Sequence, residues 1–217
     1  HESSALRYLQ YIGVNAATDV VLVVATHWHD DHIRGLSQIV DTCKQARFSW
    51  PLVFGREEFV SMVTRINKHN NSRCGPGAQE ILNVYKLLAG QSPRLASAGN
   101  RIFSMPAEET GHGLAVQVWA LSPSDDQVDA FLRDIGRNLP EAKTTKFRAV
   151  AHNPNRAALV NLIEIGPLAI LLGADLVEKN NKKFGWSALI EKRDKMLPKA
   201  CAYKIAHHGS ESGHHDD

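Results

Sequence analysis

The sequence predicts an α/β fold, because short β-branched runs alternate with helical patterns along most of its length. Val20–Ala25 is a continuous apolar run, typical of a strand buried on both faces. Residues 33–44 then have helical spacing, Pro51–Gly55 is the next predicted strand, and residues 56–67 again have helical spacing. The 217 residues contain no internal repeat, so we expect a single domain.

The remaining elements follow from the same periodicities. Ser124, a residue type that caps helices, precedes a helix predicted over residues 125–139. Gly166-Pro167 separates two apolar runs and predicts a hairpin. Helices are further expected over 5–12, 78–89 and 187–196, a loop over 68–77, and strands over 101–104, 115–121, 158–165, 168–172 and 202–206.

Composition indicates a globular chain. Apolar residues make up 43% and charged residues 22%, which excludes disordered and fibrous classes. No run of 18 apolar residues and no basic-apolar leader occurs, so we expect a cytoplasmic protein with no membrane segment. Cys43, Cys74 and Cys201 are odd in number and widely spaced, which argues against disulfides and against a Cys-rich zinc module. A net charge of +2 indicates no particular partner.

The 11 histidines are unevenly distributed, and their densest group follows the first predicted strand as His27-Trp28-His29-Asp30-Asp31-His32. Three imidazoles and a carboxylate within six residues suit a divalent metal of borderline softness. His27 and His29 can converge in extended or turn backbone, and Asp31 and His32 can face a second metal. A polar surface loop with unrelated histidines is the simpler alternative.

Two later strands also end in ligand-type residues. Asp175 follows the apolar run 168–172, and His207 and His208 follow residues 202–206. Asp175 alone is a weak signal, because an aspartate after a strand often caps a helix. Three strands that each end in such residues predict a site built on a rigid scaffold.

The order strand-HxHxDH, strand-Asp, strand-His resembles the metallo-β-lactamase superfamily. Residues 6–36 and Lys204–Ser210 (KIAHHGS) are most similar to the nuclease-type domain of ComEC competence proteins. The resemblance implies a four-layer αββα sandwich. It departs from the family at Ile33-Arg34-Gly35, where two glycines are usual, and at Leu172-Gly173-Ala174-Asp175, which replaces L-T-G-D. The family also has earlier strands and a further C-terminal part, so we expect residues 1–217 to be one domain that is partial at both ends.

The same resemblance implies a dinuclear site with zinc, while manganese and iron remain open because no cysteine is among the ligands. It implies His27, His29 and His152 on one metal, Asp31, His32 and His207 on the other, and Asp175 bridging. His152 lies 23 residues before Asp175 and competes with His112 for the third-motif position, or else binds substrate.

These residues permit hydrolysis by a hydroxide shared between two metals, since a bound cation lowers the pKa of water. Asp31 is expected to orient this nucleophile and move its proton. His208 is expected beside the ligands or facing substrate, and Lys204 and Ser210 are candidate substrate contacts.

A lysine-rich band indicates a phosphodiester or nucleic-acid partner, although a solvated helix face explains it equally well. Trp28 and Trp186 are candidates for stacking on bases, although packing explains Trp186 at least as well. We therefore expect a phosphodiesterase or nuclease. The alternatives are a hydrolase of thioesters, lactones or β-lactams, an iron oxidoreductase, and a silent metal-binding module of a larger assembly. The band comprises Lys179, Lys182, Lys183, Lys192, Arg193, Lys195, Lys199 and Lys204, against Glu178, Glu191 and Asp194.

Overall fold

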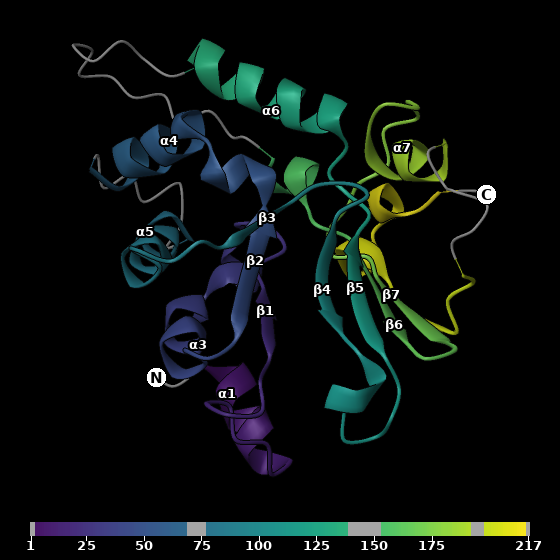
Figure 1. The fold of residues 1–217 in the computed structure, drawn as a ribbon. Helices are drawn as coiled ribbons and strands as arrows, with labels where there is room; N and C mark the ends of the chain where they lie inside the picture. Colours follow the sequence, from purple (N-terminus) through teal and green to yellow (C-terminus); the bar gives the residue numbers. More distant parts are fainter. Residues whose placement is uncertain (1–2, 69–76, 139–152, 192–197, 216–217) are drawn as a thin grey trace. The chain divides into compact units, whose positions relative to one another are not determined.

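The computed structural model describes residues 3–68, 77–138, 153–191 and 198–215. The chain is α/β, with a three-stranded sheet, a five-stranded sheet and helices (Figure 1). It divides into two compact units, the first His1–Leu95 with Leu132–Asn153 and the second Ala96–Phe131 with Pro154–Asp217. Within the described ranges, no helix combines the length and the apolar character needed to cross a membrane.

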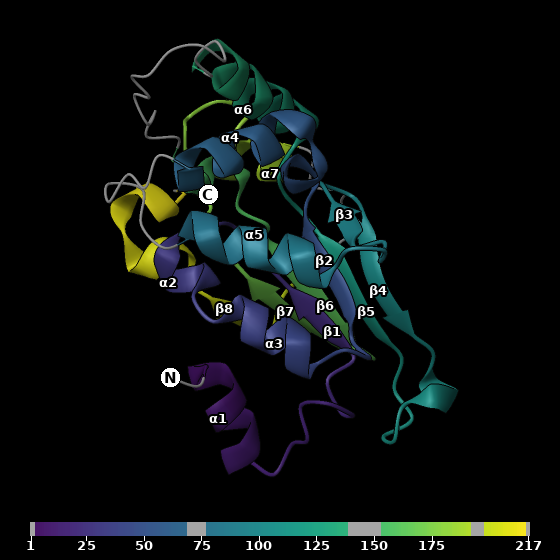
Figure 2. The same ribbon diagram turned by 90° about the vertical axis from the view of Figure 1, so that its left-hand side faces the viewer.

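The first unit is built on the sheet β1-β2-β3, in which β1 and β2 are parallel and Leu22 is paired with Arg47. Helices α3 and α5 lie on one face of this sheet, in front of it in Figure 2. The elements are α1 (Ser4–Tyr11), β1 (Leu22–Val24), α2 (Asp30–Ile33), α3 (Leu36–Thr42), β2 (Arg47–Pro51), a 3₁₀ turn (Leu52–Gly55), α4 (Glu57–Lys68), α5 (Gly77–Leu87) and β3 (Arg94–Ala96), which ends at the unit boundary.

The predicted helices α1, α4 and α5 are confirmed, but three expectations for this unit need correction. The strand expected at Pro51–Gly55 is wrong, because β2 ends at Pro51 and a 3₁₀ turn follows. A short apolar run buries equally well in either conformation, so its periodicity cannot distinguish them. β1 is half-buried rather than covered on both faces, because it forms an edge of its sheet. The helix expected over 33–44 breaks at Gly35, whose φ of +83° favours glycine.

An aromatic core holds the first unit together. The rings of Phe54 and Phe59 stack at 4.5 Å with an interplanar angle of 11°. Trp28 meets Phe59 edge-on at 5.7 Å, and the Tyr85 hydroxyl donates a hydrogen bond to the Phe54 carbonyl. Burial raises the pKa of Tyr85, so its phenol remains a donor at physiological pH. Trp28 therefore packs in the core, contrary to the expectation that its ring stacks on a base.

The second unit contains the sheet β4-β5-β6-β7-β8, antiparallel up to β7 and parallel between β7 and β8. The expected hairpin at Gly166-Pro167 is confirmed as β6-β7, and Ser124 caps α6 by accepting a hydrogen bond from the Gln127 amide at 3.2 Å. The elements are β4 (Arg101–Met105), β5 (Val116–Ala120), α6 (Asp125–Asn138, which runs across the unit boundary), β6 (Asn161–Ile165), β7 (Leu168–Leu172), α7 (Gly185–Glu191) and β8 (Ala202–Lys204).

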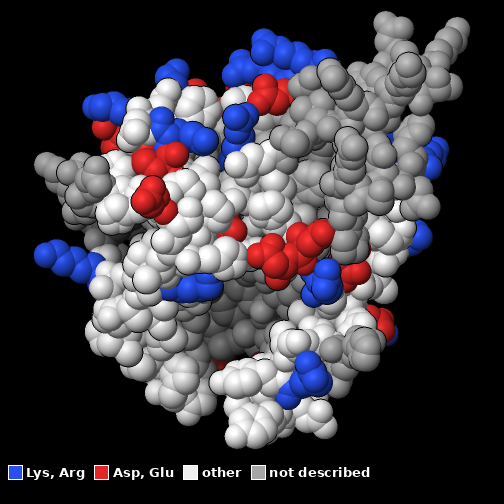
Figure 3. Space-filling view, turned by 180° about the vertical axis from the view of Figure 1, so that it is seen from behind, with Lys and Arg blue, Asp and Glu red and all other residues white. Residues whose placement is uncertain are grey.

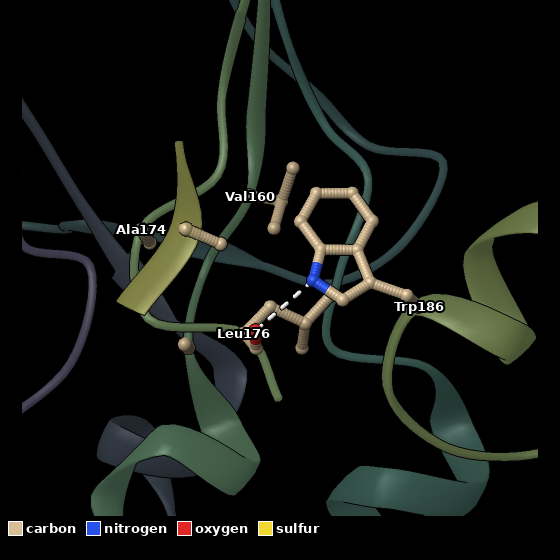
Figure 4. Close-up of a cluster of buried hydrophobic side chains, with 6 residues drawn as sticks. Val160, Ala174, Leu176 and Trp186 are labelled. Atoms are coloured by element: carbon tan, nitrogen blue, oxygen red, sulfur yellow. Dashed lines mark hydrogen bonds between the residues drawn. The ribbon is translucent and has the colours of Figure 1, made fainter. Parts of the chain in front are cut away.

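The core of the second unit surrounds Trp186 (Figure 4). The Trp186 indole N–H donates to the Leu176 carbonyl at 3.0 Å, and the ring lies among Val160, Ala174 and Leu176. Trp186 is 7% exposed, which matches the packing alternative rather than base stacking. Ala174 and Leu176 flank Asp175, and Ala206 of the same core precedes His207. The core therefore fixes the backbone on which both strand-end motifs stand.

Glu178 organises the segment between β7 and α7. Its backbone amide donates to the Ser212 carbonyl at 2.6 Å. Its carboxylate accepts from the Ser187 hydroxyl at 2.6 Å and from the Ser187 amide at 2.8 Å, in the first turn of α7. Burial raises the pKa of Glu178, but the hydrogen bonds from Ser187, Asn180 and Lys179 outweigh it and hold this pKa below its ordinary value.

Replacing Glu178 by glutamine should lower the free energy of unfolding by about 1 kcal/mol at neutral pH. A carboxyl whose pKa is depressed by folding stabilises above its unfolded pKa, and this contribution is lost as pH falls through the folded value. The difference between wild type and Glu178→Gln, measured by urea unfolding, should therefore vanish in acid. Glu191→Gln is the control, since Glu191 forms an exposed ion pair with Lys182, a residue that precedes α7. A difference that does not change with pH would contradict the assignment.

Candidate metal centre

Two side chains anchor the loop after β1 through contacts with helices, and neither belongs to the candidate ligands. The Trp28 ring packs on Phe59 of α4. Asp30 Oδ1 accepts a hydrogen bond from the Gly77 amide, the first residue of α5, at 2.7 Å. A Cβ at Gly77 would lie 2.8 Å from Asp30 Oδ1 and 2.9 Å from the Trp28 carbonyl, so only glycine fits there. Trp28 and Asp30 thus fix the loop to two helices.

Three histidines of the same segment, His27, His29 and His32, form an imidazole group. The His27 ring centroid lies 4.2 Å from that of His32 and 5.5 Å from that of His29. One ligand nitrogen of His27 and one of His32 lie within 4.8 Å of each other. His27 is fully buried, and its Nδ1 lies 3.1 Å from the Thr26 hydroxyl. A hydrogen bond to one ring nitrogen is the usual way in which a ligating histidine is oriented.

Asp31 is more exposed than its neighbour Asp30 and has a different partner. Its side chain is 58% exposed, and its Oδ2 lies 3.5 Å from His32 Nε2. An accessible carboxylate beside an imidazole can accept a proton from a reacting group, as the sequence predicts for Asp31. Together His27, His29, Asp31 and His32 form the first ligand group.

The second group lies at the carboxyl ends of β7 and β8. These strands are parallel and neighbouring, so Asp175 and the His207-His208 pair follow at the same edge of the sheet. The Gly173 amide donates to the Lys204 carbonyl at 3.1 Å, and the His207 amide donates to the Ala174 carbonyl at 3.0 Å. These two bonds tie together the turns that carry the ligand-type side chains.

Within this group the structure places His208 beside Asp175. Asp175 is 1% exposed, and its Oδ2 lies 3.6 Å from His208 Nε2. His207, the expected ligand, has its Nδ1 2.8 Å from the Ser212 hydroxyl, a contact that orients the ring. The His208 side chain is 62% exposed, so it can meet a solute while it contacts the buried carboxylate.

Backbone strain is concentrated at this second group. Ala174, His207 and His208 have φ values of +46°, +45° and +54°, although none of them is glycine. Left-handed backbone costs a residue with a side chain roughly 1–2 kcal/mol. Such strain persists where the surrounding structure holds it, and it is common at functional sites.

The other predicted site residues have local contacts or lie outside the described residues. His152 lies outside them, as do Lys192, Arg193 and Lys195 of the lysine band. His112 accepts a hydrogen bond from the Leu114 amide at 3.2 Å within its own exposed loop. The Ser210 hydroxyl lies 3.1 Å from that of Ser212, and Lys204 is exposed on β8.

The lysine band is partly neutralised by acidic neighbours. Lys182 lies 3.0 Å from Glu191, and Lys183 lies 3.6 Å from Asp126. On the face seen in Figure 3, the described Lys and Arg side chains are interspersed with Asp and Glu and form no continuous basic surface. Two of the described lysines of the band are therefore paired with carboxylates.

Sequence reasoning missed the two hydroxyl residues that orient imidazoles. Thr26 contacts His27 from the preceding position, and Ser212 contacts His207 from five residues ahead. Thr26 carries a weak sequence signal, since it lies directly between the predicted strand and the first histidine. Ser212 carries none, because its contact depends on the turn that follows β8.

The donor sets of both groups fit divalent metal ions. Imidazole nitrogens and carboxylate oxygens are ligands for zinc, manganese and iron. Asp175 is a buried carboxylate, and burying such a charge costs free energy unless cations or donors compensate it. No protein-family model, curated protein or solved structure matches the chain. A function for this chain is therefore argued from its own side chains.

Proposed function

We propose that the chain is a metal-dependent hydrolase of the metallo-β-lactamase type, acting on a phosphodiester and related to the ComEC-type domain that its sequence resembles. The observation that carries this proposal is the group of three imidazoles around buried His27, with the exposed Asp31 carboxylate beside His32. His27, His29, Asp31 and His32 of the first unit would bind metal, as would Asp175 and His207 of the second. Two divalent ions are proposed, zinc in the first place.

In this proposal different residues of the chain orient the ligands and transfer protons. When bound, divalent ions supply a water of lowered pKa and take up negative charge on the substrate oxygens. Thr26 orients His27, and Ser212 orients His207. Asp31 accepts a proton at a carboxylate oxygen, and exposed His208 donates one to the leaving oxygen. Asp175, held between Ala174 and Leu176 of the core, keeps His208 in place.

Phosphate is favoured over a carbonyl substrate because exposed cations accompany the second group. Lys204 ends β8 just before His207, and Lys179 follows Asp175 in the next segment. Neither lysine has an ion pair among the described residues. Lysine ammonium groups attract phosphate oxygens, whereas a neutral ester or lactam gains nothing from them.

The experiment measures metal content and cleavage in the same preparations. The chain is stripped with EDTA, reloaded with zinc or manganese, and given bis-p-nitrophenyl phosphate, labelled single- and double-stranded DNA, RNA, a thioester and a chromogenic β-lactam. We expect about two metals per chain and metal-dependent phosphodiester cleavage. Cleavage of the carbonyl substrates alone would overturn the phosphodiester assignment, and failure to bind either metal would overturn the hydrolase.

A further inference from the structure

A pocket of about 320 Å³ lies in the second unit, beside the segment that follows Asp175. One wall comes from α6, which contributes Gln127 and Phe131 one helical turn apart. The segment between β7 and α7 contributes Val177, Lys179 and Phe184. Its volume is at the small end of the range for ligand sites, roughly 300–1,000 Å³, so it suits one compact chemical group.

The lining combines aromatic surface with positive charge. Phe131, Val177 and Phe184 are apolar, while Arg156 and Lys179 bring two cations, and the described lining includes no carboxylate. Lys179 differs from the neighbouring Lys182 and Lys183, which are paired with Glu191 and Asp126. A ligand that fits both features carries a flat aromatic group and an anionic group next to each other.

The wall formed by residues 177–184 is rigid before any ligand arrives. Glu178 holds it to α7 through Ser187, and to the 3₁₀ turn Glu211–Gly213 after β8 through the Ser212 carbonyl. Asn181 Oδ1 accepts a hydrogen bond from the Lys183 amide at 2.9 Å, which closes a tight turn before Phe184. Preorganised walls bind more tightly, because less ordering entropy is lost on binding.

The pocket is adjacent to the candidate metal ligand of the same unit. Val177 lies two residues beyond Asp175, so their Cα atoms are at most about 7 Å apart. The pocket therefore lies against the chain segment that carries Asp175.

We infer that this pocket is a nucleotide subsite, in which the base packs against Phe184 and the 5′-phosphate meets Lys179 and Arg156. This rests on the proposed function and narrows it: the substrate is a nucleic acid or nucleotide phosphodiester, and the pocket holds one nucleoside unit next to the bond that is cleaved. Ring stacking favours any aromatic base, whatever its identity, and the two cations Lys179 and Arg156 favour its phosphate.

Binding is tested without metal, so that the result does not depend on hydrolysis. EDTA-treated full chain is titrated by calorimetry with AMP, with adenosine and with inorganic phosphate. We expect saturable binding of AMP that is at least about tenfold tighter than that of adenosine or phosphate, because only AMP offers both groups. Lys179→Met and Phe184→Ala should each weaken AMP binding about tenfold or more.

Lys182→Met is the matched control, since it removes a neighbouring lysine that does not line the pocket. It should leave AMP affinity unchanged; equal losses in Lys179→Met and Lys182→Met would overturn the subsite, as would the absence of saturable AMP binding. AMP binding without any phosphodiester cleavage would contradict the proposed hydrolase activity and support the nucleotide-binding pocket. Cleavage with a KM unaffected by Lys179→Met and Phe184→Ala would contradict the subsite and support the hydrolase activity.

Discussion

Asp31→Ala should lower metal-dependent phosphodiester cleavage at least about hundredfold, the usual contribution of a group that moves a proton in the transition state. It should also lower the metal content. Because the Asp31 side chain is 58% exposed, the fold should depend little on it. The free energy of unfolding, measured in EDTA by urea denaturation, should change by no more than about 0.5 kcal/mol.

The matched control is the adjacent residue, Asp30→Ala. Asp30 accepts the first amide of α5 at Gly77, so its loss leaves a helix-terminal donor without this acceptor. This variant should lose about 1 kcal/mol of stability and keep its metal and its cleavage rate. The same substitution at two neighbouring positions thus gives opposite outcomes. Full activity in Asp31→Ala would contradict the assignment, and the reverse pattern would move the motif by one residue.

Asp175→Asn should have the second large effect, on metal binding. The substitution keeps the shape of the side chain and removes its charge. We expect metal affinity, measured by competition with a chromogenic chelator, to fall at least about tenfold to hundredfold, and cleavage to fall with it. The stability of the metal-free chain should change by less than about 1 kcal/mol, because the partner imidazole of His208 is 62% exposed and such pairs contribute little.

Asp126→Asn controls for the loss of a paired carboxylate. Asp126 lies 3.6 Å from Lys183, the same separation as between Asp175 and His208, yet it belongs to no ligand group. It should keep metal affinity and cleavage. A purely structural role for Asp175 would show itself differently, as a loss of roughly 3–5 kcal/mol of stability with metal affinity intact, the cost of breaking a buried pair.

Much of the fold could be predicted from the sequence where periodicity was long or turn chemistry was specific. The amphipathic helices α4, α5 and α6 and the Gly166-Pro167 hairpin are confirmed, because side-chain spacing and turn residues act locally. β3 was not anticipated, and Pro51–Gly55 was assigned to the wrong state. Segments of three to five residues bury their apolar groups in several conformations, so tertiary packing selects among them.

For the candidate site, the motifs alone identify which residues have ligand chemistry and predict that each group follows a strand. The role of each residue inside its motif depends on tertiary contacts. In Trp28-His29-Asp30-Asp31, Trp28 packs in the core and Asp30 accepts a hydrogen bond from the Gly77 amide. His29 and Asp31 are therefore the two candidate ligands of this segment. At the end of β8, left-handed backbone at His207 and His208 brings the second histidine to Asp175. Spacing cannot reveal either arrangement, because both depend on contacts with residues far away in the chain.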